Sequence, residues 1–271
     1  MTTAGDDAFT EAIAAQYERY LVPLIFEPYA ANMAARVTSR SPQRVLEIAA
    51  GTGAVTRAMS ATLARDVAVV ATDLSQAMID HAQTLGTERP VEWRQADVLA
   101  LPFDDQEFDT VVCQFGVMFL PHKSTAFAEA HRVLRPGGAF IFNVWDRIEE
   151  NEFADTVATA VAAMFPGDPP SFLSRTPYGY SDRSVIQRDL SAGGFLAHAQ
   201  LTTIAKRSRA DSGNIPAIAF CLGTPLKNEI EARDPTRVAT AVDVSTQALV
   251  ARFGDGGLNS RMQACIVEIS R

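Results

Sequence analysis

The stretch that decides the fold is residues 44–53, which read Arg44-Val45-Leu46-Glu47-Ile48-Ala49-Ala50-Gly51-Thr52-Gly53. Its first half is a short, nearly continuous apolar run, as expected of a strand that is covered on both faces of a parallel sheet. Its second half consists of small residues, which let the backbone turn sharply and let a ligand approach closely. Thr56, Met59 and Leu63 continue at helical spacing. The stretch therefore predicts a buried strand, a ligand-binding turn and a helix.

The segment from Glu47 to Gly53 resembles the first motif of class I S-adenosylmethionine (SAM)-dependent methyltransferases, in which an acidic residue precedes Gly-x-Gly-x-Gly. Ala49 stands in place of the first glycine, so less room is expected beside the cofactor. The run from His131 to Gly138 (HRVLRPGG), followed by an apolar strand, is similar to the group of these enzymes that includes ubiquinone and menaquinone biosynthesis methyltransferases. The resemblance covers residues 44–146 and implies SAM as the cofactor and methyl transfer as the activity.

A dinucleotide-binding Rossmann turn is the nearest alternative, since its pyrophosphate also rests on backbone N–H groups at a helix N-terminus. However, Thr56 occupies the place of the third glycine in Gly-x-Gly-x-x-Gly. Glu47 also ends the strand close to the expected pyrophosphate, and two like charges repel strongly in a poorly hydrated pocket. SAM carries a sulfonium and an ammonium instead, which a carboxylate such as Glu47 favours. The turn therefore favours SAM over a dinucleotide.

A second acidic residue, Asp73, ends the apolar run 66–73, twenty residues past Gly53. At that separation an acidic residue at the end of the second strand meets the ribose of an adenosine-containing cofactor. A carboxylate can accept hydrogen bonds from both ribose hydroxyls. The alternative is that Asp73 caps the predicted helix 76–85, a role that Ser75 could fill equally well.

A third acidic residue, Asp97, follows a short strand within residues 91–98. The methyltransferase resemblance implies that Asp97 accepts a hydrogen bond from the adenine amino group and that the N–H of Val98 faces a ring nitrogen. The alternative is a solvent-facing turn residue. The resemblance assigns further residues to the cofactor site, namely Ala49, Gly51, Gly53, Leu74, Met78, Ala96, Gln114 and Phe115.

The acceptor pocket is predicted beside residues 108–115, which read as the fourth strand, and the loop 116–121 at its carboxyl end. Ligands of open parallel sheets gather outside the carboxyl ends of the strands, so this loop should border the methyl group that is transferred. Phe115 and Met118 predict a desolvated lining, whereas Phe119 and Leu120 are interpreted as core residues under a helix.

The chemistry needs few catalytic groups, because the methyl group of SAM already carries its leaving group. The protein mainly aligns the acceptor for in-line displacement and excludes water. The acceptor is expected to be an O, N or C atom of an apolar or aromatic small molecule. A hydroxyl acceptor benefits from a base, and His122 beside the loop 116–121 is the candidate catalytic residue. Its alternative role is to cap the following helix.

Two helices are predicted before the first strand, within residues 1–40. The first is indicated by apolar residues at four-residue spacing, at Phe9, Ile13, Tyr17 and Leu21. Pro23 is expected to interrupt it, and a second helix is predicted for residues 25–37.

These two helices either cover the methionine end of the cofactor or only pack against the sheet. Tyr20 and Arg36 are candidate cofactor ligands and Tyr17 is a candidate substrate contact, because each offers a polar tip on an apolar stem.

The rest of the chain completes the predicted architecture. Residues 41–146 should form the SAM-binding core, and residues 147–181 an insertion over the acceptor, with Phe172 and Tyr178 in the substrate pocket. Residues 182–271 should complete the sheet and hold a helical insertion at about 211–255. The predicted fold is α/β: a Rossmann-like, seven-stranded, mostly parallel sheet with helices on both faces and a helical lid over its carboxyl edge.

The composition restricts the kinds of partner that are expected. The formal net charge of −8 disfavours a nucleic-acid partner, because phosphate binding needs clustered Lys and Arg. Cys113, Cys221 and Cys265 are widely separated, so reduced core thiols are expected and no metal site is predicted. The sequence shows no signal peptide and no membrane span, which predicts a cytoplasmic protein, and it is compatible with a homodimer.

Two other functions compete with that of a methyltransferase. The first is a non-catalytic SAM-binding or partner-binding protein of the same fold. The second and weaker one is a nicotinamide-dependent reductase.

Overall fold

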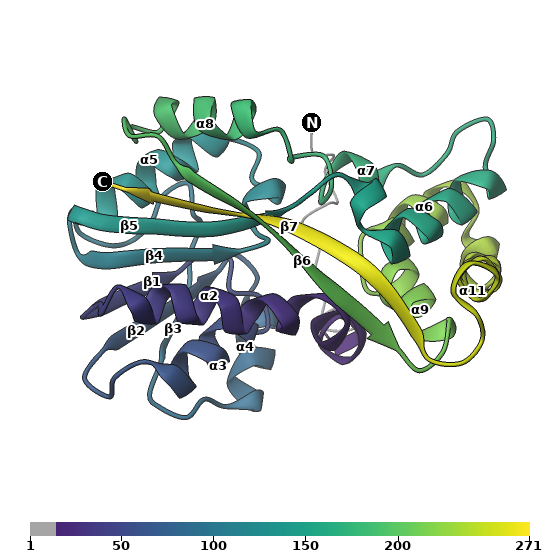
Figure 1. Cartoon of the computed structure of the whole chain (residues 1–271), viewed down its shortest axis with the longest axis horizontal. Helices are drawn as coiled ribbons and strands as arrows, with labels where there is room; N and C mark the ends of the chain where they lie inside the picture. The colour runs from purple at the N-terminus through teal and green to yellow at the C-terminus, as the bar shows by residue number, and fades with distance from the viewer. Residues whose placement is uncertain (1–14) are drawn as a thin grey trace.

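One sheet of seven strands runs through the computed structural model, which describes residues 15–271 (Figure 1). The strands are β1 (Arg44–Glu47), β2 (Ala68–Asp73), β3 (Glu92–Gln95), β4 (Phe108–Gln114), β5 (Leu134–Trp145), β6 (Gln200–Ala210) and β7 (Leu258–Ser270). Their order is β3-β2-β1-β4-β5-β7-β6, in which β1 to β5 pair in parallel and β7 is antiparallel to both β5 and β6. The predicted mostly parallel, Rossmann-like sheet is confirmed.

Helices cover both faces of this sheet (Figure 1). On one face, α2 (Glu27–Ser39) and α3 (Ala54–Thr62) share an apolar core with β1, β2, β4 and β5. On the other face lie α5 (Lys123–Val133) and α8 (Arg183–Ala192), while α4 (Gln76–Leu85) contacts β2 and β3. β1 and β4 are buried almost throughout, which explains why they read as continuous apolar runs. Full burial of a side chain such as Val45 stabilises the fold by about 1.5–3 kcal/mol.

The helical segment that precedes β1 differs from the prediction at Pro23. The chain does not break there: the π-helical segment η1 (Tyr17–Phe26) contains Pro23 and runs directly into α2. Proline lacks an N–H and clashes with the carbonyl four residues earlier in an α-helix, and the π-helical pattern avoids that four-residue spacing. Phe9 and Ile13 of the predicted first helix lie outside the described residues.

The two predicted insertions form a single helical layer, here called the helical cap. Its helices are α6 (Glu152–Met164), α7 (Phe172–Arg175), α9 (Asn214–Leu222), α10 (Leu226–Arg233) and α11 (Val238–Phe253). α11 packs against both α6 and α9, so segments on either side of β6 in the sequence share one layer. Short 3-10 turns lie at η2 (Val117–Phe119), η3 (Ile148–Glu150) and η4 (Pro235–Arg237).

A two-stranded ribbon connects the sheet to the helical cap. Residues 264–270 of β7 pair with β5, whereas residues 258–263 pair only with residues 205–210 of β6. This ribbon continues past β5, and β7 packs against α6 and α11 (Figure 1). The backbone N–H groups of Arg261 and Gln263 donate to the side chains of Glu152 and Asn151, which fastens α6 to the ribbon.

Two expectations from the composition can be compared with the structure. Cys113, Cys221 and Cys265 are free and buried, as predicted. Within residues 15–271, no helix combines the length and the apolar character that crossing a membrane requires.

Candidate active site

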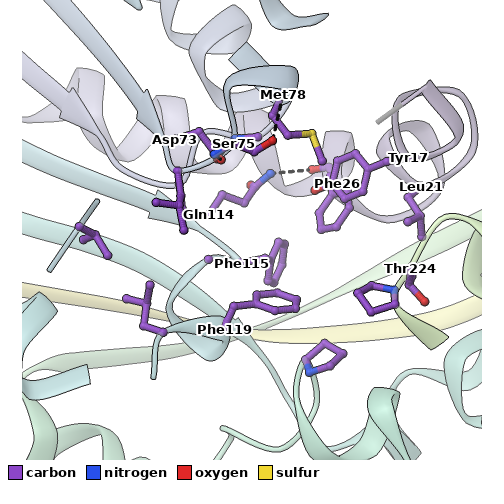
Figure 2. A pocket seen from close by; sticks show the side chains of 18 of the residues that line it. Tyr17, Leu21, Phe26, Asp73, Ser75, Met78, Gln114, Phe115, Phe119 and Thr224 are labelled. Atoms are coloured by element: carbon purple, nitrogen blue, oxygen red, sulfur yellow. Dashed lines mark hydrogen bonds between the residues drawn. The ribbon is translucent and has the colours of Figure 1, made fainter. Parts of the chain in front are cut away.

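A cavity of about 570 Å³ lies at the carboxyl ends of β1 to β4, between the sheet and the helical cap. Its size falls within the range of about 300–1,000 Å³ that small-molecule sites occupy. Its lining comes from η1, from the loops that follow the strands, from α7 and from the α9–α10 connection. Figure 2 shows Asp73 and Ser75 on one side of the cavity and Phe119 and Thr224 on another.

The turn after β1 adopts the left-handed backbone that its small residues predict. Ala49 has φ +52° and Gly51 has φ +56°, a region that costs an alanine roughly 1–2 kcal/mol but suits glycine. A Cβ placed on Gly116 would lie 2.6 Å from the Cβ of Ala49. Gly116 therefore makes room for the methyl group that Ala49 adds to the motif, although Ala49 also lines the cavity.

Asp73 connects the ends of β2 and β1. Its Oδ2 accepts a hydrogen bond from the N–H of Gly51 at 2.8 Å, and its Oδ1 accepts one from the N–H of Ser75 at 2.9 Å. Burial raises the pKa of Asp73, and these backbone hydrogen bonds oppose the rise. The cap of α4 is Ser75, whose Oγ accepts from the N–H of Met78. Asp73 therefore does not cap α4. Its side chain lines the cavity instead.

Glu47 lies below the turn rather than in the main cavity. Its side chain is 1% exposed and its Oε2 accepts a hydrogen bond from the hydroxyl of Thr56 at 2.5 Å. Burial raises the pKa of Glu47 to about 8, against the opposing effects of Thr56 and Arg57.

A second cavity of about 20 Å³ adjoins the main one and is lined by Glu47. Tyr17, Phe26, Ala49 and Gln114 line both cavities. The Nε2 of Gln114 donates to the carbonyl of Phe26 at 3.3 Å, and its buried Oε1 has no hydrogen-bond partner within the described chain (Figure 2). A space of this size holds one water-sized polar group, and both nearby side chains offer acceptor oxygens.

Asp97 lies at the exposed mouth of the cavity. Its Oδ1 accepts a hydrogen bond from the N–H of Leu99 at 2.9 Å, the turn bond expected of the alternative interpretation. Val98, Ala96 and Leu74 also line the cavity, and Leu74 is 58% exposed. The exposed side chain of Leu74 thus gives this part of the cavity an apolar surface.

The structure brings together most of the predicted cofactor residues. Those that line the main cavity are Ala49, Gly51, Asp73, Leu74, Met78, Ala96, Asp97, Val98, Gln114 and Phe115. The predicted substrate residues Tyr17, Phe172 and Tyr178 line it as well.

Other predicted residues lie outside the lining of the main cavity. Arg36 forms an ion pair with Glu268 of β7, and Tyr20 packs at the edge of the core. Gly53 begins α3 with φ +82°, beneath the ring of Trp93. His122 is an exposed residue at the start of α5 and makes no side-chain cap there. None of these four is among the described residues that line the main cavity.

The loop after β4 reverses the predicted roles of its apolar residues. Met118 is buried and does not line the cavity, whereas Phe119 and Leu120 do. Phe119 and Leu120 are partly buried, and they pack against the core while they line the cavity. The interpretation of Phe119 and Leu120 as core residues thus describes one of their two contacts, because they also line the cavity.

Sequence reasoning also missed several lining residues. Trp145 ends β5, and its ring stacks on Phe115 with centroids 3.7 Å apart and 6° between the planes. The rule that ligands gather at strand ends could have identified Trp145. Phe26, Phe220 and Thr224 come from η1 and the helical cap, and no local motif marks them.

The charges around the cavity have one sign. Among the described lining residues, the charged side chains are Asp73 and Asp97, and there is no Lys or Arg. The buried Glu47 adds a third carboxyl group beside the second cavity. Within residues 15–271, no group of His, Cys, Asp and Glu side chains could hold a metal ion. The site is therefore suited to a ligand that carries positive charge, and unsuited to a diphosphate.

Similarity to known proteins agrees with this geometry. Residues 46–142 match the family described as a methyltransferase domain. The ubiquinone/menaquinone biosynthesis C-methyltransferase UbiE of Pseudomonas savastanoi pv. phaseolicola is 40% identical over 106 residues, which make up 38% of this chain and 41% of UbiE. The match thus covers less than half of the length of that relative.

Two solved structures share the fold. The YcgJ protein of Bacillus subtilis has a TM-score of 0.56 at 19% identity, over 90% of this chain and 99% of YcgJ. Phosphoethanolamine N-methyltransferase 2 of Haemonchus contortus, solved with phosphomonomethylethanolamine and S-adenosylhomocysteine, has a TM-score of 0.58 at 15% identity, over 100% of this chain and 60% of that one. The chain therefore has the fold of these two proteins, and its residues 46–142 match the methyltransferase domain family.

Proposed function

We propose that this protein transfers the methyl group of SAM to an apolar small molecule. The observation that supports this best is the presence of two aspartates, Asp73 and Asp97, in a cavity whose described lining has no basic side chain. A sulfonium and an ammonium are attracted by such a site, whereas the phosphates of a nicotinamide cofactor are repelled. Bound SAM supplies an activated methyl group; the protein supplies its position and a dry environment.

The described residues fit SAM in three places. Asp73 faces the cavity from the end of β2 and keeps lone pairs for ribose hydroxyls beyond the hydrogen bonds from Gly51 and Ser75. Asp97 and the N–H of Val98 lie at the mouth, where an adenine edge needs an acceptor beside a donor. The second cavity, with Glu47 and the unpartnered Oε1 of Gln114, suits the ammonium of the methionine end.

The other half of the cavity is proposed to hold the acceptor. Its lining is mainly aromatic and includes Phe119, Trp145, Phe172 and Phe220. Such side chains exclude water, which strengthens the attraction between reacting groups and prevents hydrolysis. Residues 147–181 and 211–255 act in this proposal as one acceptor-binding layer. The cytoplasmic location and the homodimer stay predictions.

Isothermal titration calorimetry with SAM, S-adenosylhomocysteine and NADH tests the cofactor. Binding of both adenosyl compounds with no NADH binding is expected. Tight NADH binding without SAM binding would contradict the proposal and favour the reductase.

A non-catalytic SAM-binding protein of the same fold is the remaining alternative. It predicts SAM binding without turnover, whereas the enzyme forms S-adenosylhomocysteine with a suitable acceptor. Mass spectrometry of reactions with phenols, amines and quinone precursors distinguishes the two.

A further inference from the structure

The acceptor half of the cavity is electrically neutral. The charged lining residues among those described, Asp73 and Asp97, lie at the ends of β2 and β3, on the side assigned to the cofactor. Lining residues from η1, η2, α7 and the α9–α10 connection are all uncharged. A protonated amine, a carboxylate or a phosphate in this half would lose its hydration without gaining an opposite charge, which is strongly unfavourable.

Its walls favour a flat molecule. The rings of Phe115 and Trp145 are nearly parallel and stacked, and Trp145 also contacts the ring of Tyr178 at 5.8 Å between centroids. Phe119 and Phe172 form another tilted pair, with centroids 6.4 Å apart. Aromatic walls of this kind bind planar rings by offset or edge contacts.

One hydroxyl group in this half is available to a ligand. Tyr178 is 5% exposed and lines the cavity, and its hydroxyl makes no hydrogen bond to the part of the chain that the structure describes. Burial raises the pKa of Tyr178, and nearby Tyr29 adds to the rise, so the hydroxyl remains a donor at neutral pH. The hydroxyl of Thr224 is different, because it donates to the carbonyl of Phe220 and accepts from the N–H of Leu226.

We infer that the acceptor is an uncharged, planar molecule with a phenolic or enolic hydroxyl, and that the hydroxyl of Tyr178 donates a hydrogen bond to that oxygen. This inference rests on the proposed methyl transfer. A hydroxyl that faces the cavity loses its water when a ligand fills that cavity, and an acceptor oxygen on the ligand restores a hydrogen bond. Tyr178 is thus a specificity-determining residue of the acceptor site.

Methyl transfer to this acceptor needs no basic side chain of the protein, because water takes up the proton. The acidic hydroxyl of the acceptor loses its proton to water, and the hydrogen bond from Tyr178 stabilises the resulting oxyanion. The oxyanion, or the ring carbon next to it, forms the bond to the methyl group. The sulfur–methyl bond breaks and its electron pair stays on sulfur, giving neutral S-adenosylhomocysteine. After attack by carbon, the ring proton leaves to water.

Three probes of one shape test the acceptor class: 2-naphthol, 2-naphthoate and 2-naphthylmethylammonium. Calorimetry uses the full chain saturated with S-adenosylhomocysteine, so that no turnover occurs. We expect 2-naphthol to bind at least tenfold more tightly than either charged probe. Equal binding of a charged probe, or no binding of 2-naphthol, overturns the inference.

The variant Tyr178→Phe tests the hydrogen bond, with Tyr20→Phe as the control because Tyr20 does not line the cavity. Tyr178→Phe should weaken 2-naphthol binding about three- to tenfold. Absorbance titration of bound 2-naphthol should also give a higher pKa in Tyr178→Phe than in the wild type and Tyr20→Phe, a change that a packing defect alone does not produce. An unchanged pKa overturns the role of Tyr178.

The inference and the proposed function can fail separately. If S-adenosylhomocysteine does not bind, the proposed function is wrong, and the same probes on the free protein still measure the preference of the cavity. If S-adenosylhomocysteine binds but the probes behave otherwise than expected, only the acceptor class is wrong.

Discussion

The carboxylate of Asp73 accepts a hydrogen bond from the backbone N–H of Gly51, with 2.8 Å between oxygen and nitrogen. This bond fixes the turn after β1 to the end of β2. A single side chain thus orders the glycine turn and faces the cavity. Because Gly51 has a left-handed backbone, this hydrogen bond also holds the turn in a conformation that few residues adopt.

The first prediction concerns this carboxylate. Asp73→Ala should weaken SAM binding by about 1–3 kcal/mol, because a charged hydrogen-bond partner is lost. Calorimetry measures the dissociation constant. Asp66→Ala is the matched control, since Asp66 is exposed in the turn before β2. A dissociation constant unchanged in Asp73→Ala would show that the ribose assignment is wrong.

The second prediction is a pH dependence that arises from Glu47. Its folded-state pKa of about 8 lies above the ordinary value of 4.5, so the folded protein binds more protons than the unfolded chain between these pH values. The stabilising contribution of Glu47 is therefore complete below about pH 4.5 and is lost as the pH rises through about 8.

In the wild type, the free energy of unfolding should fall with rising pH by at most about 1.4 kcal/mol per pH unit because of Glu47. The variant Glu47→Gln should reduce this slope. Urea unfolding at several pH values between 5 and 8 measures the free energy of unfolding. Glu92→Gln, at an exposed position on β3, should retain the wild-type slope. Identical slopes in Glu47→Gln and the wild type would contradict the assigned cause.

The third prediction concerns the contact between Ala49 and Gly116. Gly116→Ala should destabilise the fold by about 1–3 kcal/mol, because its Cβ would lie 2.6 Å from the Cβ of Ala49 and 2.7 Å from the Sγ of Cys113. Adding Ala49→Gly should recover part of the loss, since one of the two clashes disappears. Denaturant unfolding of the single and double variants gives the coupling energy. If the effects of the two substitutions on the free energy of unfolding simply add, the contact between Ala49 and Gly116 is refuted.

The fourth prediction concerns the helical cap. Glu229 of α10 accepts hydrogen bonds from the N–H groups of Ser171 and Phe172 and from the side chain of Arg175, so it holds α7 in place. Glu229→Ala should increase hydrogen exchange in residues 171–178, as measured by mass spectrometry. Glu231→Ala is the control, because Glu231 forms an ion pair at the surface with Lys227 of the same helix. Equal exchange in both variants would exclude this role for Glu229.

The sheet and the cofactor half of the cavity were largely predictable because both depend on local patterns. Apolar runs mark buried parallel strands, and the acidic residues that follow them meet at one edge of the sheet. Asp73 could therefore be placed beside Gly51 from spacing, Asp97 could be placed there from the resemblance to methyltransferases, and the cavity contains all three.

The contributions of η1, α2 and the loop after β4 were less predictable, because they depend on partners far apart in the sequence and on local backbone geometry. Arg36 was expected at the cofactor, but its guanidinium pairs with Glu268, 232 residues away. The π-helical backbone of η1 changes which side chains face the cavity, and Tyr20 is turned away from it. In the same way, Met118 of the 3-10 turn η2 is buried in the core, and its neighbour Phe119 lines the cavity.

The ribbon of β6 and β7 determines how a substrate can enter. The sheet passes without a break into the strands that support α6, since residues 258–263 of β7 are paired with β6 throughout. The layer above the acceptor is therefore not a flap on a loop hinge. Widening the entrance on this side means twisting a hydrogen-bonded hairpin, so access should depend on the stiffness of its pairing more than on the length of any connecting loop.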